Sequence, residues 1–170
     1  LSDTVDDYEN CDNDFEIYRY SENTCKITGY KGSKTKLKIP KKIYGRVVTG
    51  INSLGSNATI KEVIIPNNIE ITDFAFDNCS SLQKITVADD NKYYTSVDGI
   101  LFSKNKDTII RFPIGRSETE YVIPDSVIEI GDNAFEDCGN LLSITIPYGV
   151  TTLGDNAFSG TSISVIDIPA

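Results

Sequence analysis

The sequence predicts a strand-dominated repeat solenoid of the α/β type, and three recurring features support this. The pentapeptide Gly-Asp-Asn-Ala-Phe occurs at residues 131–135 and again at 154–158, a shift of 23 residues. Apolar residues alternate before each Pro, as in Ile144 and Ile146, which is the pattern of a short strand. Ile-Pro pairs recur along the chain, at 39/40, 65/66, 123/124, 146/147 and 168/169. A period of roughly 20 to 29 residues with such spacing is typical of a leucine-rich-repeat solenoid.

Each repeat is expected to form one coil of a right-handed solenoid, with one parallel strand per coil of about 23 residues. The Pro ends the strand because it cannot donate the next ladder hydrogen bond. In the best copy, residues 122–141, we expect the return side of the coil to be filled by Val127, Ile130, Ala134 and Phe135. A coil would not be stable alone, because each covers the apolar face of its neighbour.

Three stretches depart from this unit. After Pro66 the Ala-Phe pair comes one residue early, at Ala75-Phe76. Between residues 51 and 63 the unit is two residues short, and Leu54 stands where Phe is expected. Residues 88–113 follow another pattern, with two turn-like segments beside apolar runs, and predict a β-hairpin inserted into the stack.

The N-terminal part divides into two segments before the repeats of residues 34–170. Residues 1–14 predict an acidic, poorly ordered leader. Residues 15–33 predict a β-hairpin cap, with strands at 15–20 and 24–30 around a turn at 21–23. Such a cap would cover the exposed edge of the first coil.

The two ends of the chain suggest that it is part of a longer protein. The sequence contains no methionine, so Leu1 is expected to follow a processing site or a boundary. The sequence stops at the close of a predicted strand without a polar closing element, so we expect further repeats or another domain after Ala170.

Charge is distributed unevenly around a net value of −9. Residues 1–16 hold seven acids and no base, residues 17–46 hold nine bases and one acid, and residues 47–170 hold seven bases and seventeen acids. In one interpretation the acidic leader is a solvated tail lying near the basic stretch. In the other, the bases form a patch for a polyanion such as a sulfated glycan or sialylated mucin. Nucleic acid is not expected as a partner, because the remaining acidic surface would repel phosphates.

A second set of candidate ligand contacts lies on the strand face that points away from the core. Its apolar members, Ile64 and Val122, could instead be ordinary β-branched strand residues. Across both sets, the candidate ligand-binding residues are Lys36, Lys38, Lys41, Lys42, Arg46, Ile64, Thr86, Val122 and Thr145.

Little in the sequence indicates catalysis, a metal or a cofactor. The absence of histidine removes the Ser-His-Asp and Cys-His nucleophile pairs and the commonest zinc ligand. Cys79 and Cys138 occupy one repeat slot and are expected to be buried and unbridged. A Cys11–Cys25 disulfide tying the leader to the cap is one alternative for the remaining pair. No run of 18 apolar residues is present, so no membrane insertion is expected.

The repeat Ile-Pro, Val, Ile-Gly, Ala-Phe, Cys, Leu resembles the BspA-like, or Treponema pallidum type, class of leucine-rich repeats. The segments "ITGYKGSKTKLKIPKKIYGRVVTGI" and "YYTSVDGILFSKNKDTIIRFP" are similar to parts of such proteins in gut and oral bacteria. The resemblance covers roughly residues 15–170. It implies a secreted or surface-attached protein without catalytic activity that binds host matrix, mucin or other cells.

Two other functions remain open. The coils could be an ancillary spacer or targeting segment of a larger surface enzyme, or they could self-assemble through open solenoid edges. We expect a monomer whose partner is a host or bacterial surface protein or glycan, polyanionic glycans included.

Overall fold

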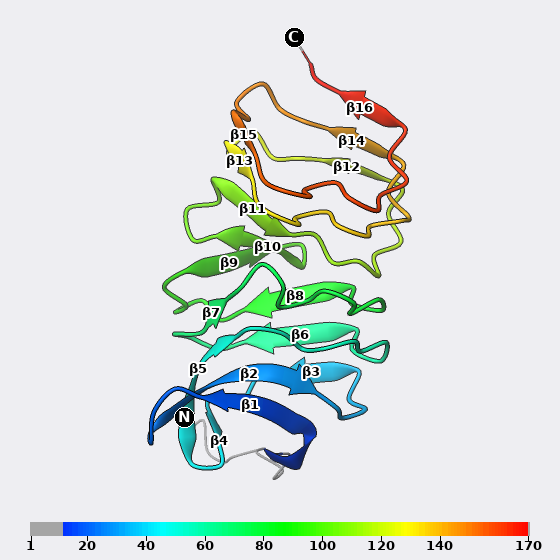
Figure 1. Cartoon of the computed structure of the whole chain (residues 1–170). Helices are drawn as coiled ribbons and strands as arrows, with labels where there is room; N and C mark the ends of the chain where they lie inside the picture. The colour runs from blue at the N-terminus through cyan, green and yellow to red at the C-terminus, as the bar shows by residue number, and fades with distance from the viewer. Residues whose placement is uncertain (1–11, 170) are drawn as a thin grey trace, which may run out of the picture.

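The computed structural model describes residues 12–169, which form one continuous stack of coils from the N-terminal end to the C-terminal end (Figure 1). Strands and turns build every coil, and the described residues contain no α-helix. One 3-10 turn, η1 (Asp12–Asp14), precedes the first strand. The predicted strand-dominated solenoid is therefore confirmed, although the return side of each coil consists of turns instead of helices.

Sixteen strands make up the described stack. Their bounds are β1 (Phe15–Arg19), β2 (Thr24–Tyr30), β3 (Lys36–Lys38), β4 (Lys42–Ile43), β5 (Arg46–Ile51), β6 (Glu62–Ile65), β7 (Glu70–Ile71), β8 (Lys84–Val87), β9 (Tyr94–Val97), β10 (Ile100–Ser103), β11 (Thr108–Arg111), β12 (Glu120–Val122), β13 (Glu129–Ile130), β14 (Ser143–Thr145), β15 (Thr152–Leu153) and β16 (Val165–Asp167).

The strands predicted before the Ile-Pro pairs, together with β8, line one side of the stack in two parallel sheets, β3-β6-β8 and β12-β14-β16 (Figure 1). In the first sheet Glu62 is in register with Lys84, 22 residues on. In the second, Glu120 is in register with Ser143, and Ser143 with Val165, at steps of 23 and 22 residues. The period deduced from the sequence is thus the period of the coil.

A second ladder of short strands follows another side of the coils. Here β5 pairs with β7, and β11, β13 and β15 pair in succession, always parallel. The prediction of one parallel strand per coil is therefore incomplete, because most coils carry two strands. The second strand is only two residues long in β7, β13 and β15, too short for its alternation to stand out in the sequence.

The first coil lies beside an antiparallel hairpin of β1 and β2. Strand β2 continues this contact by pairing parallel with β5, so the hairpin extends the ladder side of the stack. The side chains of Phe15, Cys25 and Ile27 point into the core and are almost fully buried.

The inserted segment is a three-stranded meander, where the sequence predicted a single hairpin. Strand β10 pairs antiparallel with β9 on one side and with β11 on the other. Strand β11 then joins the solenoid by pairing parallel with β13. Both turns predicted in this segment are present, and the second returns the chain to the ladder.

The repeated Ala-Phe positions form the return wall of the core. Ala134 and Phe135 are fully buried, and Phe135 stacks between Phe112 and Phe158 with ring centroids 5.3 and 5.2 Å apart. Backbone hydrogen bonds place Leu54 in the same slot as these rings. The N–H of Leu54 donates to the carbonyl of Ala75 in the next coil, and the N–H of Phe135 donates in the same way to the carbonyl of Ala157. The assignment of Leu54 to the Phe slot is confirmed.

The buried side chain of Asn57 holds the short coil at residues 51–63 together. Its Oδ1 accepts hydrogen bonds from the N–H groups of Thr59 and Ile60, at 2.9 and 3.1 Å, and its amide donates to the carbonyl of Tyr30. The side chain thus satisfies two backbone N–H groups of this coil and one carbonyl beside it.

Candidate functional site

The sheet β3-β6-β8 brings together three residues of the predicted outward row. Lys38, Ile64 and Thr86 are consecutive register partners. Their neighbours Leu37, Val63 and Ile85 point the other way and are buried, as the two-residue period of a strand requires. Lys38 is exposed, while Ile64 and Thr86 are half-buried.

A charged row runs beside these three residues. Glu62 lies in register between Lys36 and Lys84, with nitrogen–oxygen distances of 3.1 and 3.7 Å. The Thr86 hydroxyl also donates a hydrogen bond to Glu62. Desolvation alone would raise the pKa of Glu62, but the hydrogen bonds from Lys36 and Thr86 and the two lysine charges lower it. Lys36 is therefore partly neutralised within its own sheet.

The second half of the outward row lies on the sheet β12-β14-β16. Val122, Thr145 and Asp167 are register partners there, and Val122 is 67% exposed. This row does not join that of β3-β6-β8, because the meander β9-β10-β11 enters the stack between the two sheets (Figure 1). The outward row is thus two short surfaces.

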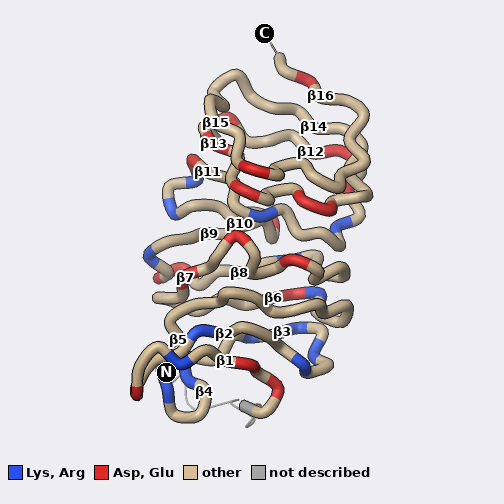
Figure 2. The backbone as a smooth tube through the Cα atoms, in the orientation of Figure 1, with Lys and Arg blue, Asp and Glu red and all other residues tan. Residues whose placement is uncertain are grey.

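The predicted basic residues lie at the N-terminal end of the stack, where Figure 2 shows Lys and Arg concentrated over the first coils. The fold divides them between two sheets. Lys36 and Lys38 belong to β3, whereas Lys42 and Arg46 belong to β4 and β5 on the ladder side. Lys38, Lys41 and Lys42 are exposed, and none of the three forms a salt bridge within residues 12–169.

A small groove of about 240 Å³ lies beside Lys41 and is lined by Thr49, Asn67 and Asn68 among others. Arg46 is less available than its position in the sequence suggests. Its Nη1 donates to the carbonyl of Tyr44, and its Nε is buried without a hydrogen-bond partner among the described residues. Of the five predicted basic contacts, Lys38, Lys41 and Lys42 are therefore the three that are exposed and form no salt bridge within the described residues.

The cysteines of the repeat slot are buried, as expected. Cys79 and Cys138 are 0% and 2% exposed and carry free thiols. Burial raises the pKa of Cys79 to about 11 and that of Cys138 to about 12, so both stay protonated at neutral pH. Cys25 is also buried in the hairpin. The proposed bridge to Cys11 falls outside the described residues.

Arg111 is a buried charge that the sequence reasoning missed. It is 2% exposed and stands beside Phe112, in the slot that Ala134 fills in the next coil. Its Nη1 donates to the carbonyl of Asn133 and lies 3.5 Å from Oδ1 of Asp77. The dipeptide Arg-Phe in place of Ala-Phe was the available signal.

The comparisons with known proteins agree with this architecture. A family model described as the BspA type leucine rich repeat region, in six copies, matches residues 50–120 and 115–170. These matches cover most of the chain, and the chain belongs to this family of repeat proteins.

Among solved structures, the chain is similar to a leucine-rich repeat protein from Eubacterium ventriosum, with a TM-score of 0.65 and 30% identity over 78% of this chain. The match covers 37% of that protein, so this chain spans little more than a third of its length. The leucine rich repeat protein of T. pallidum has the same fold, with a TM-score of 0.51 and 21% identity over 91% of this chain and 68% of that one.

Comparison with curated proteins found no match. Within residues 12–169, no group of three or more acidic, cysteine or histidine side chains is arranged to hold a metal ion. The same residues include no helix of the length and apolar character needed to cross a membrane.

Proposed function

We propose that this chain is a non-catalytic binding module of a secreted or surface-attached protein, and that it recognises polyanionic groups on host matrix, mucin or other cell-surface macromolecules. The observation that carries the proposal is a set of exposed lysines at the N-terminal coils that form no salt bridge within residues 12–169, Lys38, Lys41 and Lys42. Charges left free in this way keep their full attraction for an anionic partner.

The position of these lysines supports a contact that wraps around one end of the stack. Lys38 lies on the strand side and Lys42 on the ladder side of the same coil. Further along, residues 47–170 hold seventeen acids and seven bases, and Figure 2 shows acidic residues on the later coils. A polyanion would therefore be attracted to the first coils and repelled from the later ones. Membership of the BspA-type family supports the surface location.

The test is binding of the chain to immobilised mucin, matrix glycoproteins and sulfated glycans at low and near-physiological salt. The triple variant Lys38→Glu, Lys41→Glu, Lys42→Glu should lose binding. A matched control changes the same amount of charge elsewhere, at Lys61, Lys92 and Lys104, and should retain most of it. Binding through charge should also weaken as salt rises.

Equal loss in both variants would mean that net charge, and not this site, drives the interaction. Failure of the chain to bind any of these surfaces would favour the alternative function, a spacer or targeting segment of a larger surface enzyme. Either result would overturn the proposed site.

A further inference from the structure

The stack is opened at one place by the inserted meander. On the return side, backbone hydrogen bonds link Leu54 to Ala75, Phe112 to Ala134 and Phe135 to Ala157. Among the described residues, no backbone hydrogen bond links residues 73–79 to residues 109–114. We call this interruption the seam. The buried apolar residues also form two clusters, whose boundary passes through the meander: Leu101 belongs to the first cluster, and Ile100 and Phe102 belong to the second.

A groove of about 460 Å³ lies over the seam. Ser56, Asn78, Ile114 and Asp137 line it, and each stands two residues after the Phe slot of its own coil. Ala58 and Ser80 complete the lining from two positions further on. The groove therefore runs along the stack across four successive coils. At about 4.8 Å per coil it is roughly 14 Å long, which suits a linear ligand.

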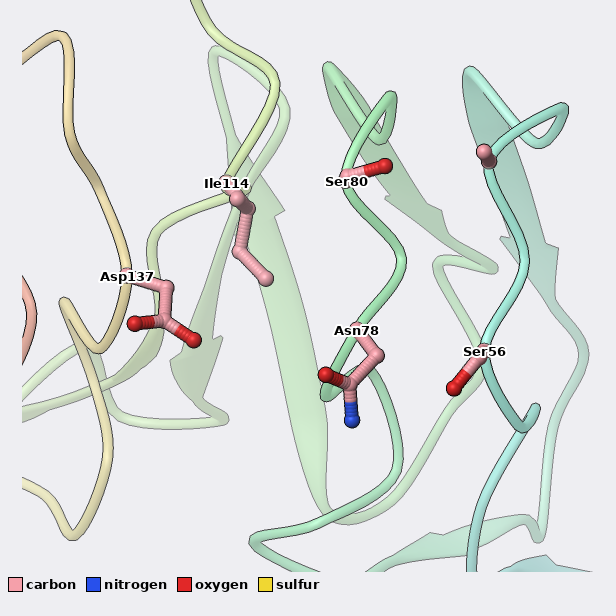
Figure 3. A pocket seen from close by; sticks show the side chains of 6 residues that line it. Ser56, Asn78, Ser80, Ile114 and Asp137 are labelled. Carbon is pink, nitrogen blue, oxygen red and sulfur yellow. The ribbon is translucent and has the colours of Figure 1, made fainter.

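The polar side chains of the groove, on Ser56, Asn78, Ser80 and Asp137, are all exposed to solvent. Figure 3 shows Asp137 and Asn78 projecting from their turns toward the gap between them, with Ile114 beside it. Asn78 and Asp137 have φ angles of 61° and 58°, a left-handed conformation that Asn and Asp tolerate better than most residues. Next to Ile114, the N–H of Gly115 donates to the carbonyl of Leu82 at 2.7 Å, which ties this turn to the preceding coil.

The chemistry of this lining matches hydroxyl groups. An amide provides donors and an acceptor, two serine hydroxyls provide both, and a carboxylate accepts two strong hydrogen bonds. Ile114 and Ala58 add small aliphatic surfaces for C–H groups. Anionic ligands are disfavoured here, because Asp77 and Glu136 lie near Asp137, and Arg111 offsets this negative charge in part.

We propose that the groove over the seam binds a neutral, linear oligosaccharide, with Asn78 and Asp137 as its principal hydrogen-bonding residues. This site is distinct from the lysines of the N-terminal coils and does not depend on their function. It is open and lacks aromatic side chains, so binding of a single chain should be weak and should gain from several copies presented on one surface.

The test uses neutral tetrasaccharides of glucose, mannose, galactose and N-acetylglucosamine, titrated into isotopically labelled protein and followed by amide NMR. At least one should shift the resonances of residues 56–58, 78–80, 114 and 137 selectively. The variants Asn78→Gly and Asp137→Asn should each weaken that binding about tenfold or more. Both substitutions suit a positive φ, so thermal unfolding should show that the fold is retained.

The triple lysine variant described above serves as the control and should bind the same sugar normally. Binding should also be insensitive to salt, since the ligand carries no charge. The proposal is overturned if none of the four sugars shifts these resonances, or if Asn78→Gly and Asp137→Asn leave binding unchanged. Salt-sensitive binding of a tetralysine peptide at the same residues, with no response to sugars, would instead identify a site for a basic protein segment.

Discussion

The guanidinium of Arg111 lies 3.5 Å from the carboxylate of Asp77 and joins the two halves of the solenoid across the seam. Its other contact, with the carbonyl of Asn133, belongs to the following coil. Nε and Nη2 of Arg111 have no hydrogen-bond partner within the described structure. At the seam, a charged side chain thus connects the return sides of two coils. Between other neighbouring coils, the return sides are joined by backbone hydrogen bonds and apolar stacking.

Replacing Arg111 with Ala should lower the free energy of unfolding by about 2 kcal/mol. This is less than for a fully buried ion pair, because the side chain of Asp77 remains 23% exposed and can be hydrated. Urea unfolding measures the change. The double variant Arg111→Ala, Asp77→Ala should recover part of the loss, since no unpaired charge remains. A double variant less stable than Arg111→Ala would contradict this account of the pair.

Replacing Phe135 with Ala should be among the most destabilising single changes, at about 3 to 5 kcal/mol. Its ring is fully buried and stacks on both Phe112 and Phe158, so the cavity would be enclosed by neighbouring coils. The matched variant Phe158→Ala removes a half-buried ring and should cost clearly less. Thermal and urea unfolding of the pair would test this order, and equal losses would refute it.

The thiols of Cys79 and Cys138 should react slowly with iodoacetamide in the native protein at pH 8. Burial holds their pKa values at about 11 and 12, and only the thiolate is the nucleophile. Labelling followed by peptide mass spectrometry distinguishes the two sites. In urea, both should react at the rate of an ordinary cysteine. Rapid native labelling of either peptide would show that the slot opens to solvent.

The stabilisation contributed by Glu62 should depend on pH. Its folded pKa lies below the ordinary value, so the contribution is present above the unfolded pKa and is lost as pH falls through the folded one. The wild type should therefore exceed Glu62→Gln in stability at about pH 7 but not at about pH 2. In a background with Lys36→Met and Lys84→Met the pH-dependent difference should shrink. An unchanged difference would exclude the lysines as its main cause.

Much of the fold could be predicted because the relevant signals repeat. Each Ile-Pro pair, Ala-Phe pair and buried cysteine slot appears in more than one coil, so one unit explains the others. Even the irregular Leu54 could be assigned to its slot by counting. The second ladder of strands escaped prediction, because pairs of residues such as Glu129 and Ile130 are too short to reveal a period.

For the outward-facing row of candidate ligand contacts, the sequence predicted which residues of each strand face outward, but not how far the row extends along the stack. The outward positions of Lys38, Ile64 and Thr86 follow from alternation along each strand, and their alignment follows from the repeat. That this row stops before Val122 could not be deduced, because the break depends on where the meander enters the stack. The same applies to Lys42, which the turn after Pro40 carries to the ladder side.

The period of the coil, its core residues and the resemblance to the BspA-type family could all be deduced from the amino-acid sequence. These properties are local and recur, so apolar spacing and Pro positions suffice to specify them. Three features became visible only in the three-dimensional structure. The insert interrupts the stack, Arg111 bridges the interruption, and a groove lies above it. These features arise from contacts between residues far apart in the chain, such as Asp77 with Arg111, whose distance depends on how successive coils pack.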